Sequence, residues 1–142
     1  MYLPITLTFA AAASLLNIWL GMRIARLRLQ HKVLHGDGQN DTLSRRMRAQ
    51  ANYVEYTPFV LILTGAIELA LGSADWLWLL ALVYIVGRVL HAFGMDKDFV
   101  SKLRQVGILV TWLTILGLAG MALYTAYGAP SRELPPALGM QV

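Results

Sequence analysis

The stretch YLPITLTFAAAASLLNIWLGM, residues 2–22, decides the class of this protein. It contains no Asp, Glu, Lys, Arg or His, and it is long enough to cross the hydrocarbon core of a bilayer, which takes roughly 20 apolar residues as a helix. The first cations follow the apolar run instead of preceding it, which disfavours a cleaved signal peptide. We therefore expect a transmembrane helix here.

Three further apolar runs cover residues 53–71, 75–95 and 101–127, and the first of them continues from a polar, amphipathic start near Thr42. The chain has 142 residues, of which 57% are hydrophobic and only 14% charged. These features predict an all-α membrane protein, a four-transmembrane-helix up-down bundle formed by residues 1–128. The Pro-containing segment 129–142 is predicted to be a flexible tail, because proline cannot continue a helix.

The connection between the first two runs, residues 35–41, is dense in turn-forming residues, and Asp41 or Thr42 is placed to cap the helix that follows. The absence of cysteine excludes disulfides, a thiolate nucleophile of the protein's own and a sulfur-ligated metal. His31 and His35 have the spacing of a metal-binding pair, but nothing nearby completes a ligand set, so we expect no metal.

The formal net charge of +4 reflects cations that are concentrated in two segments, residues 23–48 and 88–104. These segments flank alternate connections of the four runs, as the positive-inside rule requires when both termini lie on the non-cytoplasmic side. The excess of basic residues thus indicates membrane topology, and we expect no nucleic-acid partner.

Polar side chains recur at the start of the second run. Arg48, Asn52 and Glu55 have i, i+4 and i+7 spacing, so they lie on one helical face; Tyr56 borders that face and Gln50 lies away from it. A charge within a transmembrane helix is costly and therefore suggests a functional site. The alternative is a local ion pair in which Arg48 reaches Glu55.

The third run presents Arg88 and His91 at i, i+3 spacing and at the same membrane depth, and Lys102 and Arg104 join them where the fourth run begins. Together with the polar face of the second run they predict a mixed-charge pocket with an excess of cations. Such a pocket suits a small zwitterion with more carboxylates than ammonium groups, and glutathione fits this description. Glu68, near the other end of its helix, is expected to be structural or to reach the interface.

Three segments carry a resemblance to a known family. RAQANYVEYTP at 48–58 resembles the second-helix signature of the MAPEG family, the membrane-associated proteins in eicosanoid and glutathione metabolism. GRVLHAFG at 87–94 is similar to the family's third-helix motif, and the loop at 31–38, HKVLHGDG, to its bacterial branch. The resemblance implies a multi-pass protein of a bacterial inner membrane that forms a homotrimer.

The resemblance also implies that glutathione, as co-substrate, binds in a bent shape between neighbouring subunits near the cytoplasmic face. Arg104 would stabilise the glutathione thiolate and is the expected catalytic residue. The adjacent subunit would supply an arginine of the first helix, Arg26 or Arg28. The other expected glutathione contacts are Arg48, Gln50, Asn52, Glu55, Tyr56, Arg88 and His91.

The expected function is that of an integral membrane glutathione transferase, with glutathione-dependent peroxidase activity as a further reaction. Its second substrate would be a lipophilic electrophile or a lipid hydroperoxide that arrives from the membrane lipids. Met95 occupies a position where eicosanoid-synthesising members of the family have a tyrosine, which argues against a specific eicosanoid reaction. The alternative is a non-catalytic membrane trimer that binds glutathione or a lipid. A proton-coupled exporter is disfavoured, because the first run has no acidic residue.

Overall fold

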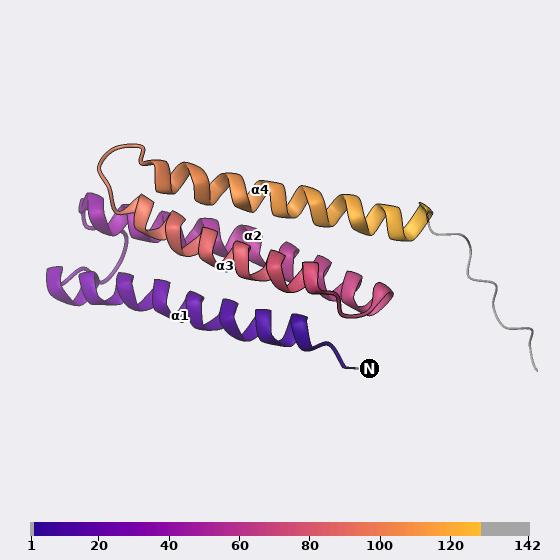
Figure 1. The fold of residues 1–142 in the computed structure, drawn as a ribbon. Helices are drawn as coiled ribbons and strands as arrows, with labels where there is room; N and C mark the ends of the chain where they lie inside the picture. The colour runs from indigo at the N-terminus through magenta and orange to yellow at the C-terminus, as the bar shows by residue number, and fades with distance from the viewer. Residues whose placement is uncertain (1, 129–142) are drawn as a thin grey trace, which may run out of the picture.

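The computed structural model describes residues 2–128, which form four long helices lying side by side (Figure 1). The helices are α1 (Pro4–His31), α2 (Asp41–Leu71), α3 (Asp75–Met95) and α4 (Lys102–Leu123), and a π-helical turn, η1 (Tyr124–Gly128), follows α4. α1 and α4 each pack against both α2 and α3. The part of the chain that is described contains no strand, so the predicted four-helix up-down bundle is confirmed. The predicted tail, 129–142, lies outside the described residues.

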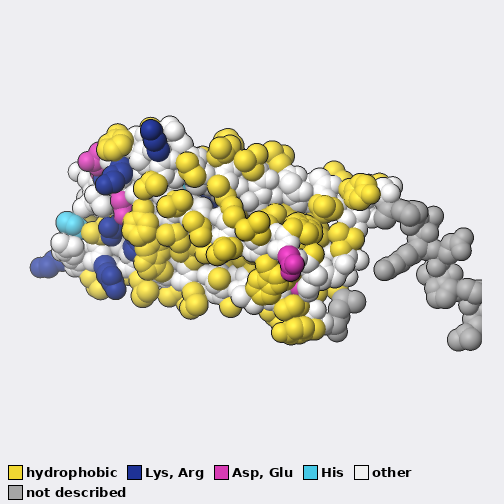
Figure 2. Space-filling view, in the orientation of Figure 1, with side chains coloured by type: hydrophobic (Ala, Val, Ile, Leu, Met, Phe, Trp, Pro, Cys, Tyr) yellow, Lys and Arg dark blue, Asp and Glu magenta, His cyan; other side chains and the backbone are white. Residues whose placement is uncertain are grey.

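The core of the bundle is built from helical stripes of apolar residues. In α1 the buried residues Ile5, Phe9, Ala13, Leu16 and Leu20 recur every three or four positions, which places them on one face. In every helix fewer than half of the residues in the most apolar window are buried inside the bundle. The remaining apolar side chains cover the outside of the molecule (Figure 2), as is required of a protein surrounded by lipid.

The two ends of the bundle differ in charge. The connections 32–40 and 96–101 lie together at one end, which we call the basic end, because the Lys and Arg side chains gather there (Figure 2). The short turn 72–74 and the start of α1 lie at the opposite end. The clustering of cations at alternate connections therefore places them at one end of the folded molecule.

The helices at the basic end extend beyond the apolar runs, and their caps differ in part from the prediction. α1 continues past residue 22 to His31, since residues 23–31 contain neither Gly nor Pro. The predicted N-cap of α2, Asp41 or Thr42, was wrong: the side chain of Asn40 accepts the backbone N–H of Leu43 at 2.9 Å. Asn40 has an extended backbone, and its amide oxygen can reach the backbone N–H three residues later, so it caps the helix as well as Asp would.

At the opposite end, Glu68 of α2 holds the start of α1. Its carboxylate accepts hydrogen bonds from the backbone N–H groups of Ile5 (3.0 Å) and Thr6 (2.8 Å), from the Thr6 hydroxyl (2.6 Å) and from the Ser73 hydroxyl (2.7 Å). The first turn of α1 lacks a side-chain cap of its own. Glu68 is only 2% exposed and supplies the missing acceptors, so it has the structural role that was predicted for it.

Glycines allow α3 and α4 to approach closely near the basic end. A Cβ atom added to Gly107 of α4 would lie 2.6 Å from the carbonyl oxygen of Gly87 and 2.5 Å from the Cβ of His91, both on α3. A Cβ atom added to Gly94 of α3 would meet the backbone of Arg104. Small residues at such contacts are typical of helix packing in membranes. Here they bring the start of α4 directly against the polar end of α3.

Candidate functional site

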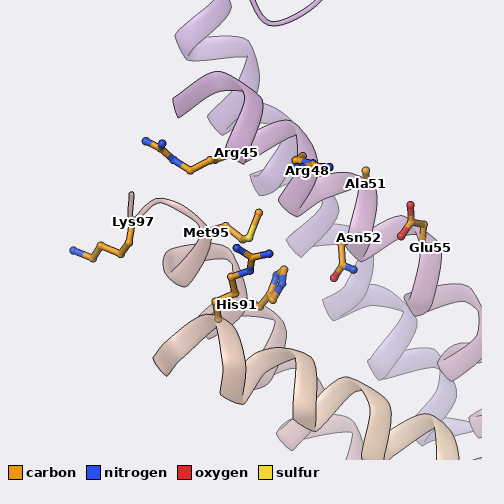
Figure 3. A pocket seen from close by; sticks show the side chains of 9 residues that line it. Arg45, Arg48, Ala51, Asn52, Glu55, His91, Met95 and Lys97 are labelled. Atoms are coloured by element: carbon orange, nitrogen blue, oxygen red, sulfur yellow. The ribbon is translucent and has the colours of Figure 1, made fainter. Parts of the chain in front are cut away.

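A polar cleft of about 400 Å³ opens at the basic end between the beginning of α2, the end of α3 and the beginning of α4 (Figure 3). This volume is within the range of small-molecule binding sites, which is about 300–1,000 Å³. Four cationic side chains line it, together with one acidic and one imidazole side chain. The lining residues are Arg45, Arg48, Ala51, Asn52, Glu55, His91, Met95, Lys97 and Arg104.

The α2 wall of the cleft is the polar face predicted from the sequence. Arg48, Asn52 and Glu55 all line it and follow one another along the helix (Figure 3). Arg45 extends the same face by one turn toward the water. One wall of the cleft thus carries cations at its outer end and a carboxylate at its inner end.

The alternative interpretation of this face, a local ion pair between Arg48 and Glu55, was wrong. Within residues 2–128 the ion pairs join Arg23 and Arg46 to Asp96, and Arg45 to Asp98. Neither Arg48 nor Glu55 takes part in them, and both side chains are exposed. Both charges are therefore free to bind a ligand.

The two predicted residues of α3 occupy different places. His91 lines the cleft, and its Nδ1 atom is buried without a hydrogen-bond partner. Arg88 lies behind the wall: it is 2% exposed and donates to the Asn52 amide oxygen at 2.9 Å and to the Thr111 hydroxyl at 3.1 Å. Its guanidinium also lies 5.6 Å from the centre of the Tyr53 ring. Arg88 consequently fixes the side chain of Asn52, which faces the cleft.

Arg104 is positioned by the start of α4. The Ser101 hydroxyl accepts the backbone N–H of Arg104 at 3.3 Å and itself donates to the carbonyl of Gly94 at 3.1 Å. This cap and the glycine contact described above hold the first turn of α4 against α3. The Arg104 side chain lines the cleft and has no carboxylate partner among the described residues. The structure thus brings Arg48, Asn52, Glu55, His91 and Arg104 together, as the sequence predicted. The expectation that Lys102 joins them was wrong, because this exposed side chain at the start of α4 does not line the cleft.

Four other predicted contacts do not line this cleft. Gln50 faces α1, where its amide donates to the Asn17 amide oxygen at 3.4 Å. Arg28 of α1 donates to the carbonyl of Leu34 at 3.1 Å. Arg26 is exposed on α1, and Tyr56 is half-buried on α2. Gln50 and Arg28 both line a shallow groove on the α1 side of α2, apart from the cleft. In the described part of the chain these four residues are therefore separate from the five that line the cleft.

Sequence reasoning missed Arg45 and Lys97. Arg45 could have been found, because it precedes Arg48 by three positions on the same helical face. Lys97 lies in the connection after α3, where no helical period applies, so no pattern predicted its place. Nor did any pattern predict Asp96, which accepts hydrogen bonds from Arg23 and from Arg46, the latter at 3.2 Å.

The described residues include no group of three or more His, Cys, Asp or Glu side chains that could hold a metal ion. The cleft instead offers guanidinium groups, an ammonium group, an amide and one carboxylate. These groups can bind carboxylates and an amine, and a cation beside a bound thiol favours its thiolate form.

Comparisons with known proteins identify the family of this chain. Residues 6–124 match the model of the MAPEG family. The chain is 29% identical over 109 residues to inner membrane protein YecN of Escherichia coli strain K12, an alignment that covers 76% of this chain and 82% of that protein. The YecN protein of Escherichia coli O6:H1 matches to the same extent. Four helices able to span a membrane, together with a family match over most of the sequence, establish that this chain is a membrane protein and belongs to the MAPEG family.

Proposed function

We propose that this protein is an integral membrane glutathione transferase that activates the glutathione thiol in the cleft at the basic end. The observation that carries the proposal is the set of unpaired charges there: Arg48 and Arg104 lack a carboxylate partner within residues 2–128, and Glu55 lacks a cation. Membership of a family that includes glutathione transferases supports it.

Each charge has a complementary group on glutathione. Glu55 binds the ammonium group, and Arg48 binds the carboxylate on the same carbon atom, with Asn52 as a further hydrogen-bonding partner. Arg104 approaches from α4 and stabilises the thiolate, because a neighbouring cation lowers the pKa of a thiol. His91 completes this side of the cleft with an unpaired ring nitrogen.

The thiolate then attacks an electrophilic carbon of a lipophilic substrate and forms a C–S bond, while the leaving group departs or the adduct takes up a proton. The same thiolate can attack a lipid hydroperoxide: an S–O bond forms, the O–O bond breaks, and the lipid leaves as its alcohol after taking up a proton. A second glutathione then forms the disulfide and releases water. The apolar surface of the bundle allows either substrate to arrive from the lipid.

The functional unit in this proposal is a homotrimer in a bacterial inner membrane, with the basic end in the cytoplasm and both termini outside it. Gln50 and Arg28 line a groove on the α1 side of α2, away from the cleft. In the trimer, one arginine of the first helix, Arg26 or Arg28, would contact the glutathione of a neighbouring subunit, and Gln50 would contribute a glutathione contact from the second helix. The concentration of cations at one end supports the orientation, and the inner-membrane relatives support the location.

The test is an ultraviolet titration of the glutathione thiolate in the presence of the detergent-purified protein. Wild type is expected to show thiolate absorbance near neutral pH, and Arg104→Ala is expected to lose it while glutathione still binds. Glu55→Gln is expected to weaken glutathione binding. Lys102→Ala is the control, because this exposed lysine begins the same helix but does not line the cleft.

Binding of glutathione without thiolate formation would contradict the transferase and favour the alternative, a non-catalytic trimer. Met95 lines the cleft where the eicosanoid-synthesising members have a tyrosine, so we propose no specific eicosanoid reaction. If glutathione does not bind at all, both the transferase and a non-catalytic trimer that binds glutathione would be excluded. A lipid would then be the ligand to test.

A further inference from the structure

The outer rim of the cleft carries two cations that the proposed glutathione contacts leave unused. Arg45 of α2 and Lys97 of the connection 96–101 both line the cleft and lie at the same end of it (Figure 3). The Nε atom of Arg45 is buried without a hydrogen-bond partner. Two cations at the mouth of one cleft attract a carboxylate.

In the structure, an acidic residue of the protein itself occupies this rim. The Asp98 carboxylate lies 2.7 Å from Nη2 of Arg45, and its side chain is 85% exposed. The pair joins the connection 96–101 to α2 across the edge of the cleft.

The rest of this connection is held in a different way. At its beginning, Asp96 is only 26% exposed and binds two arginines, Arg23 and Arg46. At its end, Ser101 is 6% exposed and is bonded to Gly94. Residues 97–100 between them are exposed. The pair of Asp98 with Arg45 is therefore a removable contact on a segment whose two ends are fixed.

We propose that Arg45 and Lys97 form a subsite for the glycyl carboxylate of glutathione, and that Asp98 occupies Arg45 until this carboxylate replaces it. The inference rests on the proposed function. Asp98 is thus a competitor built into the protein, which sets the affinity and selects ligands that carry a second carboxylate.

The charge order along α2 decides which carboxylate of glutathione reaches the rim. Glu55 and Arg45 are ten positions apart on α2, which corresponds to about 15 Å of helical rise. The ammonium group belongs beside Glu55, and the γ-glutamyl carboxylate is attached to the same carbon atom, so it stays near Arg48. The glycyl carboxylate, at the other end of the tripeptide, is therefore the one that we assign to the rim, and the long side chains of Arg45 and Lys97 shorten the distance that a bent glutathione has to span.

The exposure of Asp98 makes the exchange feasible: its side chain is 85% exposed, while that of Arg45 is 25% exposed. An ion pair with one partner in solvent contributes little to stability, because water and salt screen it. An incoming carboxylate therefore has little to overcome. Removal of the Asp98 charge is expected to tighten glutathione binding by about two- to fivefold.

The test is calorimetric titration of the full-length protein in a non-ionic detergent with two ligands: glutathione, and its monoethyl ester blocked at the glycyl carboxylate. Asp98→Asn is expected to bind glutathione about two- to fivefold more tightly, and Arg45→Gln about five- to tenfold more weakly. Neither change is expected to alter the affinity for the ester. Lys97→Gln is expected to show the smaller loss, again for glutathione alone. Lys102→Gln is the matched control for the loss of one cation at this end.

Equal effects of Arg45→Gln on both ligands would overturn the subsite, as would an unchanged glutathione affinity in Asp98→Asn. Asp98→Asn changes a mostly exposed side chain, so its thermal unfolding should match that of wild type and folding does not confuse the result. Failure of wild type to bind either ligand is a different outcome, since it would overturn the proposed function and the subsite with it.

Discussion

Two glutamates of α2 lie in opposite surroundings. Glu68 is 2% exposed and accepts hydrogen bonds from the backbone of α1 and from two hydroxyl groups. Glu55 is exposed in the polar cleft and has no ion-pair partner within residues 2–128. The comparison teaches that an acidic residue inside a membrane helix is structural when hydrogen bonds from the protein satisfy its carboxylate. When the protein supplies no partner, the carboxylate is available to a ligand.

The largest expected effect on stability is at Glu68, the glutamate whose carboxylate has hydrogen-bond partners. Glu68→Gln replaces two charged acceptor oxygens by one neutral oxygen and an NH₂ group that faces the donors of Ile5, Thr6 and Ser73. Because hydrogen bonds to charged groups contribute about 1.5–3 kcal/mol each, we expect a loss of about 2–4 kcal/mol in the free energy of unfolding. Thermal or denaturant unfolding in detergent measures it. An unchanged midpoint would show that Glu68 does not hold α1.

A smaller but distinct effect is expected at the contact that places Arg104 beside the cleft. Gly107→Ala puts a methyl group against Gly87 and His91 and should cost about 1–3 kcal/mol through overpacking. It should also weaken glutathione binding, because the start of α4 moves away from α3. Gly117→Ala is the matched control: no atom lies within 4 Å of its added Cβ, so the substitution should be neutral or stabilising. Equal effects of the two substitutions would refute the close contact.

The smallest expected effect on stability is at the unsatisfied glutamate. Glu55→Gln should change the free energy of unfolding by less than about 0.5 kcal/mol, because the exposed side chain has no partner to lose. The same variant should bind glutathione about tenfold more weakly, through loss of the ammonium contact. Calorimetry with N-acetylglutathione, which lacks the ammonium group, checks the cause. A similar loss with both ligands would mean that Glu55 does not bind the amine.

The sequence was sufficient for the fold and for half of the candidate site. Helices that span a bilayer must be long and apolar, so four runs and their flanking cations predicted the bundle and its basic end. Helical periodicity placed Arg48, Asn52 and Glu55 on one face, and the cleft confirms that they lie together. Which ligand they bind stays a prediction, since the geometry alone does not identify it.

The remaining features depend on contacts between segments far apart in the chain. The partners of Glu68 on α1 are 62 and 63 positions away, so no local pattern indicates them. Lys97 and Asp98 lie in a connection whose path follows from the anchoring of its two ends. Arg88 was predicted to face a ligand, but the packing of α3 against α4 places it behind Asn52. These positions are set by helix packing, which the order of residues does not encode locally.

The carboxylate of Asp96 has a consequence for how the protein assembles. It follows α3 directly, yet its two partners are Arg23 of α1 and Arg46 of α2, and Arg46 also donates to the backbone carbonyl of Arg23 at 3.2 Å. A hairpin of α1 and α2 alone would bring the two guanidinium groups together without an acid between them. The smallest unit that neutralises this repulsion contains three helices, so the packing of α1 against α2 at the basic end depends on the acid that follows α3.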